Sequence, residues 1–226
     1  MEPLETTRRL AADLFPTAVW VVLGGSVLTS ARTAGSDLDV VVLLPDGTPG
    51  APRRESIRYD GWPVELFVHD RASLAYYLAK DGRRPALHRM VALGTAAVGD
   101  PADDRKAARE HLDAGPAPLD QASKDSLRYG LTDLLDDLTH APDDEQAVIA
   151  TYTWLRTAEA VLSFRDHWLG SGKWLLRELR DLDPAYADRW LAARTSTAAI
   201  RDLAEEALTL AGGPLFAGYQ AAGERG

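Results

Sequence analysis

The chain has 226 residues, a formal net charge of -9 at pH 7 and 46% hydrophobic residues, a composition that suits one large or two small globular domains. It contains no cysteine, which excludes disulfides and thiolate metal sites, and no apolar run approaches the roughly 18–20 residues of a membrane span. The chain starts Met-Glu-Pro-Leu-Glu, without a basic region and an apolar stretch, so we expect no signal peptide and a cytoplasmic protein.

The acidic excess is concentrated in the second half of the sequence. Residues 1–100 hold 12 acidic and 11 basic side chains, whereas residues 101–226 hold 22 acidic and 14 basic ones. Nucleic acids are bound through Lys and Arg at the phosphates, so the second half is a poor partner for them. A cationic small molecule would suit it better, although solvated acidic helices explain the same charge more simply.

The first half alternates segments typical of helices and strands. Asp60-Gly61 between two strand-like runs is a strong hairpin signal. In chain order, we expect a helix over 5–14, a strand over 19–23, a short helix over 27–31, a strand over 38–44, a hairpin of strands 55–59 and 62–68, helices over 71–80 and 85–93, and a short strand over 96–98. These elements predict a mixed β-sheet flanked by helices.

The second half is predicted to be helical throughout. A helix over 105–112 precedes a Pro/Gly-rich linker over 114–118, which gives a boundary between domains 1–113 and 119–226. Five further helices are expected over 123–139, 143–169, 173–182, 185–193 and 196–211, with a frayed tail after Gly212. The predicted fold class is therefore α/β (α+β), a mixed sheet with flanking helices followed by a helical bundle.

An Asp-x-Asp pair marks the mouth of the second expected strand. Asp37 and Asp39 lie two residues apart, and side chains at that spacing leave a strand on the same face. Glu65 stands inside an apolar strand of the hairpin, where a charge is costly unless it is paired or bound to a metal. If a neighbouring strand brings Glu65 beside the pair, three carboxylates can hold two divalent ions about 3.5–4 Å apart for phosphoryl chemistry.

A small-residue turn precedes the carboxylates. Gly24-Gly25-Ser26 can let backbone N–H groups approach a phosphate, and a helix that starts there would add its dipole. Ser26 and Ser36 can each donate a hydroxyl hydrogen bond to the β- or γ-phosphate. Taken singly, each of these elements is as easily an ordinary turn, a helix cap or an exposed edge residue; their combination favours a nucleotide triphosphate site.

The set formed by the Gly-Ser turn, Asp-x-Asp and a later strand acid resembles the DNA polymerase β-like nucleotidyltransferase superfamily over about residues 19–68. Its size and helical second half look like the small bacterial aminoglycoside and lincosamide nucleotidyltransferases. The resemblance implies that Asp37, Asp39 and Glu65 bind two Mg²⁺ ions, and that Gly25, Ser26 and Ser36 contact the NTP, with ATP the expected one. It implies transfer of a nucleoside monophosphate to a hydroxyl of an aminoglycoside-like antibiotic, with release of pyrophosphate.

Roles in the helical half are carried over more loosely. By the resemblance, a carboxylate there is the catalytic base; Glu159, on an otherwise apolar helix, is the first candidate, and Asp133, Asp136 and Asp137 are rivals. Lys173 follows the break Gly170-Ser171-Gly172 and could reach the triphosphate, and Arg177 lies one turn further on. A solvated helix face is the alternative explanation for each of them. The five histidines show no metal-ligand spacing and are expected to be structural or superficial.

Other functions stay open at this point. A protein acceptor, as in antitoxin nucleotidyltransferases, is one alternative, although the long helical half argues against a minimal catalytic domain. A non-catalytic nucleotide-binding module is another, but it would be expected to have lost one of the carboxylates. We expect a small cationic acceptor, no nucleic acid and no membrane partner. Enzymes of this group are often dimers, so the resemblance also allows a homodimer.

Overall fold

The computed structural model describes residues 2–221. The chain divides into two compact units, Met1–Ala114 and Gly115–Gly226. None of the helices within residues 2–221 combines the length and the apolar character needed to cross a bilayer.

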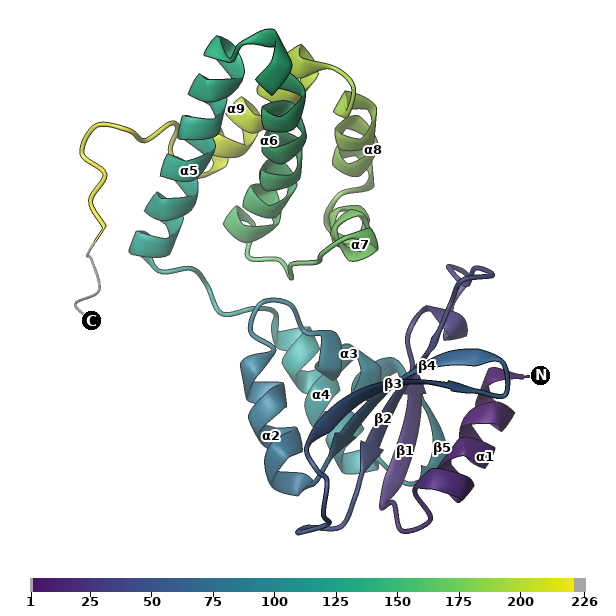
Figure 1. Ribbon diagram of the computed structural model, residues 1–226. Helices are drawn as coiled ribbons and strands as arrows, with labels where there is room; N and C mark the ends of the chain where they lie inside the picture. The colour runs from purple at the N-terminus through teal and green to yellow at the C-terminus, as the bar shows by residue number, and fades with distance from the viewer. Residues whose placement is uncertain (1, 222–226) are drawn as a thin grey trace. The chain divides into compact units, whose positions relative to one another are not determined.

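The first unit is built on one five-stranded sheet (Figure 1). Its strands are β1 (Trp20–Gly24), β2 (Leu38–Leu43), β3 (Arg53–Tyr59), β4 (Trp62–His69) and β5 (Thr95–Gly99), in the order β3-β4-β2-β1-β5. Strands β2 and β4 pair in parallel, and the other three pairs are antiparallel. The mixed sheet, with helices on it and further helices after it, confirms the predicted fold class.

Helices cover both faces of this sheet, as Figure 1 shows. On one face, α1 (Pro3–Leu14) places Leu10 against Val40 and Val42. On the other, α2 (Arg71–Lys80), α3 (Ala86–Leu93) and α4 (Ala102–Ala114) pack against Val41 and Leu43. Successive residues of a strand point to opposite faces, so the central strand β2 is apolar along almost its whole length.

The hairpin of β3 and β4 forms as predicted from Asp60-Gly61. Asp60 has φ 49° and Gly61 has φ 83°, so both turn residues adopt the positive φ that a tight hairpin turn requires. The turn sets the register, which pairs Tyr59 with Trp62 and Ser56 with Glu65. Strand β3 is the outer strand and is largely exposed and charged, a composition that discourages pairing with another chain.

The second unit is helical, as expected. It contains α5 (Gln121–His140), α6 (Asp143–Phe164), α7 (Lys173–Leu182), α8 (Pro184–Ala193) and α9 (Thr197–Leu210). Trp154 of α6 and Trp190 of α8 stack with ring centroids 3.9 Å apart, and each indole N–H donates to the other's backbone carbonyl, at 2.8 and 2.9 Å. This reciprocal pair satisfies both indoles while it joins the two helices.

Two details of the second unit differ from the sequence-based expectation. The helix expected to reach residue 169 ends at Phe164, because Asp166 adopts a left-handed φ of 47° that a helix cannot continue through. The tail after Gly212 was expected to be frayed. Its described residues, 213–221, instead pack on α5. The ring of Tyr219 stacks on Tyr129 at 4.3 Å, and Arg128 donates to the carbonyl of Gly213 at 3.0 Å.

A buried histidine at the end of β4 makes stability depend on pH. Burial lowers the pKa of His69 below its ordinary 6.5, while the charge of Asp70 opposes the shift. The unfolded chain therefore binds this proton more readily, so the contribution of neutral His69 is complete above about pH 6.5 and is lost as the pH falls further. We expect the free energy of unfolding, measured with urea at pH 7.5 and 5.5, to fall on acidification, and to fall less in His69→Gln. An equal fall in both proteins would contradict this assignment.

Candidate functional site

The end of β1, the beginning of β2 and the middle of β4 meet in one row across the sheet. Gly24, the last residue of β1, pairs with Asp39 of β2, and Asp39 pairs in turn with Glu65 of β4. In parallel neighbouring strands, paired residues point to the same face about 4.8 Å apart. The sheet itself therefore brings Glu65 beside Asp39, although 25 residues separate them in the sequence.

Asp37 completes a cluster of three carboxylates. It lies one residue before β2 and two before Asp39, on the same side. Asp37, Asp39 and Glu65 each offer one oxygen, and these oxygens all lie within 4.8 Å of one another. Within residues 2–221, no other group of three or more His, Asp or Glu side chains lies close enough to hold a metal ion. All three residues are partly exposed, so an ion from solvent can reach them.

The donor set fits a hard divalent cation. Three anionic oxygens so close together repel one another, and a cation between them removes the repulsion. Carboxylate oxygens suit Mg²⁺ and Mn²⁺, whereas the softer metals prefer nitrogen or sulfur ligands. The residues present therefore fit the metals that the sequence predicts, with Asp37, Asp39 and Glu65 as the protein ligands.

Gly25 allows the loop after β1 to lie directly against Asp39. Its φ of 78° and ψ of -172° fall in a backbone region that is essentially reserved for glycine. A Cβ at this position would lie 1.9 Å from Asp39 Oδ2, well inside contact distance. The turn thus holds its backbone and the Asp39 carboxylate together in a way that no other residue permits.

Ser26 and Ser36 lie side by side next to the carboxylates. Both are buried, and their hydroxyl oxygens are 3.2 Å apart, within hydrogen-bonding distance. Ser36 Oγ also accepts a hydrogen bond from the backbone N–H of Thr33 at 3.0 Å, which fixes its orientation. Two hydroxyls thus share one small polar spot in the loop that leads to Asp37. Their contact with phosphate remains a prediction.

The helix expected at this turn is not an α-helix. Only one turn of 3₁₀ helix is present, η1 (Ser26–Leu28), and the chain then runs through turns to β2. A three-residue turn has no aligned stack of peptide dipoles, so the expected dipole contribution to phosphate binding was wrong. Any phosphate bound here must rely on individual N–H groups and on the two serines.

The predicted site residues of the helical half belong to the second unit. Glu159 of α6 accepts a hydrogen bond from Arg156 Nη1 at 2.6 Å and is partly buried. Lys173 is the first residue of α7 and is exposed, and Arg177 stacks on Trp174 at 4.7 Å. The roles of Glu159 as base and of Lys173 as a triphosphate contact stay predictions.

The sequence analysis missed Arg54, whose guanidinium reaches the cluster. Arg54 Nη2 donates to Glu65 Oε2 at 2.8 Å, and the same guanidinium lies 5.0 Å from the ring centroid of Phe67. The register set by the turn at Asp60-Gly61 pairs residue 54 with residue 67, but the strand expected over 55–59 stopped one residue short of Arg54. A cation beside Glu65 can balance the carboxylates and can also contact a phosphate.

No protein-family model matches the chain, and no curated protein matches it. A solved structure, described as a nucleotidyltransferase-like protein from Exiguobacterium sibiricum 255-15, is similar over 92% of this chain and 77% of its own. The two chains are 14% identical, and the TM-score is 0.44. A likeness at this level supports no inference about the activity of this chain, which has to be drawn from the carboxylates and their surroundings.

Proposed function

We propose that this protein is a Mg²⁺-dependent nucleotidyltransferase, which moves a nucleoside monophosphate from an NTP to a hydroxyl of a small molecule. The observation that carries the proposal is the row of Asp37, Asp39 and Glu65, whose oxygens lie within 4.8 Å of one another beside the turn at Gly25. Oxygen ligands at this spacing, open to solvent and next to a turn of small residues, suit a metal-bound triphosphate.

The reaction is a substitution at the α-phosphorus. The acceptor oxygen forms a bond to this atom, and the bond to the oxygen bridging the α- and β-phosphates breaks, so pyrophosphate leaves with that electron pair. The proton of the acceptor hydroxyl passes to a base. Divalent ions, when bound, neutralise charge on the phosphates and make the hydroxyl more acidic. Asp37, Asp39 and Glu65 hold them in place.

The remaining residues of the first unit would position the nucleotide. Ser26 and Ser36 offer hydroxyl donors to the β- or γ-phosphate, and Gly25 keeps side-chain bulk away from Asp39. Arg54, next to Glu65, offers a planar donor to the charge that develops around the α-phosphorus. Glu159 is the first candidate for the base, with Asp133, Asp136 and Asp137 as rivals, and Lys173 is a candidate contact for the triphosphate.

The acceptor we propose is a cationic small molecule of the aminoglycoside type, and ATP is the expected donor. Support for a cationic acceptor comes from the charge of residues 101–226, which hold 22 acidic and 14 basic side chains. The test is pyrophosphate release from each of the four NTPs with Mg²⁺ across a panel of aminoglycosides and lincosamides. Acceptor-dependent release that disappears in an Asp37→Ala/Asp39→Ala double variant is expected. Absence of both release and NTP binding would overturn the proposal.

Replacing Arg54 should separate metal binding from turnover. In Arg54→Gln the cluster loses its neighbouring cation, so we expect Mn²⁺ to bind more tightly, while kcat falls by ~100- to 1,000-fold because a donor to the transferred phosphate is lost. Titration of Mn²⁺ and steady-state kinetics measure the two effects. Arg54→Lys, which keeps the charge without the planar fork, should restore the wild-type metal affinity but not the rate. A variant that loses both affinity and rate would contradict the assignment.

A further inference from the structure

A cavity of about 330 Å³ lies in the first unit, on the same face of the sheet as the carboxylates. Strand β4 connects the two: Glu65, Phe67 and His69 alternate along it, so their side chains leave the same face. Glu65 belongs to the carboxylate cluster, and Phe67 and His69 line the cavity. The cavity thus begins at Phe67, two residues beyond Glu65 and roughly 7 Å from it along the strand.

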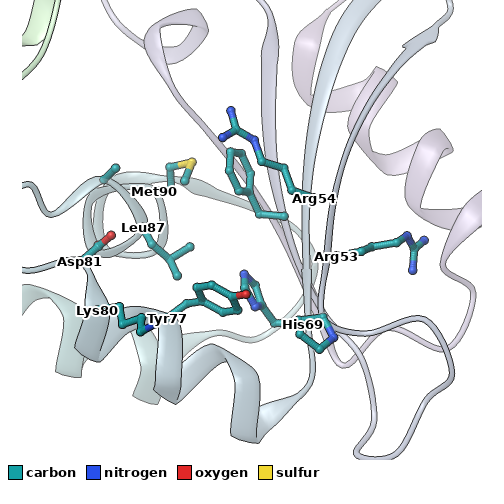
Figure 2. A pocket seen from close by; sticks show the side chains of 11 residues that line it. Arg53, Arg54, His69, Tyr77, Lys80, Asp81, Leu87 and Met90 are labelled. Atoms are coloured by element: carbon teal, nitrogen blue, oxygen red, sulfur yellow. The ribbon is translucent and has the colours of Figure 1, made fainter. Parts of the chain in front are cut away.

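The walls of the cavity are aromatic and aliphatic. Tyr77 of α2 and Leu87 and Met90 of α3 face Arg54 and His69 on the strands, as Figure 2 shows. The rings of His69 and Tyr77 are 5.4 Å apart and tilted by 56°. Tyr77 is 43% exposed, so part of its ring is open to solvent although His69 and Tyr76 contact it. This lining suits a flat, partly apolar group that can stack on Tyr77.

His69 contributes a ring with an unsatisfied nitrogen to the cavity wall. The residue is only 6% exposed, and its Nδ1, itself buried, has no hydrogen-bond partner among the described residues. A buried polar atom without a partner is costly, and native proteins seldom keep one without a reason. A neutral imidazole offers one donor and one acceptor nitrogen, and the edge of a nucleobase presents the complementary groups.

Charge and position both point to the nucleotide. Arg54 lies between the carboxylate cluster and the cavity, because its guanidinium donates a hydrogen bond to Glu65 and lies over the ring of Phe67. Lys80 also lines the cavity, whereas Asp81 is engaged with His88, whose Nδ1 is 3.0 Å away. A polycationic acceptor would meet like charge here, but the sugar and phosphates of a nucleotide would not.

Building on the proposed function, we propose that this cavity holds the base of the NTP, with the base stacked on Tyr77 and its edge turned toward the imidazole of His69. The triphosphate then extends past Arg54 to the carboxylates and to the serines beyond them. The sugar bridges the step from Phe67 to Glu65. The cavity is therefore the part of the site that can discriminate between the four nucleotides.

The test compares ligands with and without a base. Calorimetric titration in the presence of Mg²⁺ gives the Kd of ATP, GTP, CTP and UTP and of inorganic tripolyphosphate, which carries the phosphates alone. In Tyr77→Ala, we expect the best NTP to bind ~5- to 150-fold more weakly, the range typical of one base–aromatic stack, with tripolyphosphate unchanged. In His69→Asn, we expect the differences among the four NTPs to shrink. Tyr152→Ala is the matched control, because Tyr152 is an exposed tyrosine of α6 outside the cavity lining.

A second readout does not depend on the stability of the variants. The ¹⁵N resonances of the His69 imidazole in the wild-type protein should shift on addition of the preferred Mg·NTP and not on addition of tripolyphosphate. Tripolyphosphate binding with no base preference and no effect of Tyr77→Ala would overturn this inference and leave the proposed function intact. If Tyr77→Ala leaves the Kd of the NTP unchanged but raises the KM of the acceptor, this inference is overturned and the cavity belongs to the acceptor instead. Failure of both NTP and tripolyphosphate to bind would overturn the proposed function as well.

Discussion

Asp39→Asn is expected to lower acceptor-dependent pyrophosphate release by about 1,000-fold, which corresponds to about 4 kcal/mol of lost transition-state stabilisation. Asp39 is the central member of the row, since it pairs with both Gly24 and Glu65, and Asp37 lies two residues away. Its replacement by an amide of the same shape removes one anionic ligand while it keeps the packing. Steady-state release of pyrophosphate measures the loss, and titration of Mn²⁺ should show weaker binding in parallel.

The metal dependence of stability provides the control for this variant. In the wild-type protein, Mg²⁺ or Mn²⁺ should raise the melting temperature, because a ligand that binds only the folded state stabilises it. Asp39→Asn should lose that rise while it melts near the wild-type temperature without metal. Glu55→Gln is the matched substitution, because Glu55 is an acid of the same hairpin that alternation places on the opposite face from Glu65. Wild-type turnover in Asp39→Asn would show that Asp39 is not a ligand of the catalytic metal.

Gly25→Ala is expected to damage both stability and function. The backbone conformation of Gly25 costs any other residue roughly 1–3 kcal/mol, and the new methyl group would collide with Asp39 Oδ2, 1.9 Å away. The clash can be relieved only by moving the turn or the carboxylate. We therefore expect a lower free energy of unfolding in urea, weaker Mn²⁺ binding and a loss of turnover that approaches that of Asp39→Asn.

Gly35→Ala is the matched control for the Gly25 substitution. Gly35 lies in the same connection to β2, but the atom nearest to a Cβ there is Thr33 Oγ1 at 4.0 Å, and its φ is not positive. We expect this variant to keep metal affinity and turnover. A Gly25→Ala protein with wild-type melting temperature and Mn²⁺ affinity would show that the close approach to Asp39 is not required.

Local patterns predicted most of the helices and strands. The Asp60-Gly61 turn identified the hairpin, and the helix over 71–80 was predicted with its observed bounds because Asp70 is a good N-cap; its carboxylate accepts from the N–H of Ser73 at 2.8 Å. Errors arose where backbone geometry departs from residue preference. Asp166 ends α6 in a left-handed conformation that aspartate adopts only occasionally, and Ser26–Leu28 closes as a single 3₁₀ turn.

The candidate site was predicted only in part, and the limit is physical. Asp37 and Asp39 share a face by strand alternation alone, which the sequence shows directly. Asp39 and Glu65 are close together only because β2 and β4 pair in parallel. This pairing joins distant parts of the sequence, and no local sequence pattern specifies it. The cavity beyond Glu65 requires α2 and α3 to pack on β4 at a particular distance, so neither Tyr77 nor His69 stood out in the sequence.

The parallel pairing of β2 and β4 also has a consequence for the order in which the first unit forms. The ribbon of β3 and β4 closes through two turn residues, so it loses little chain entropy when it forms. Its docking on β2 closes the much longer loop from Asp39 to Glu65, and loop-closure entropy makes such a non-local contact slow. Until that step Asp37 and Asp39 lie together without Glu65 beside them. Pairing of β4 with β2 and assembly of the three carboxylates are therefore one and the same folding event.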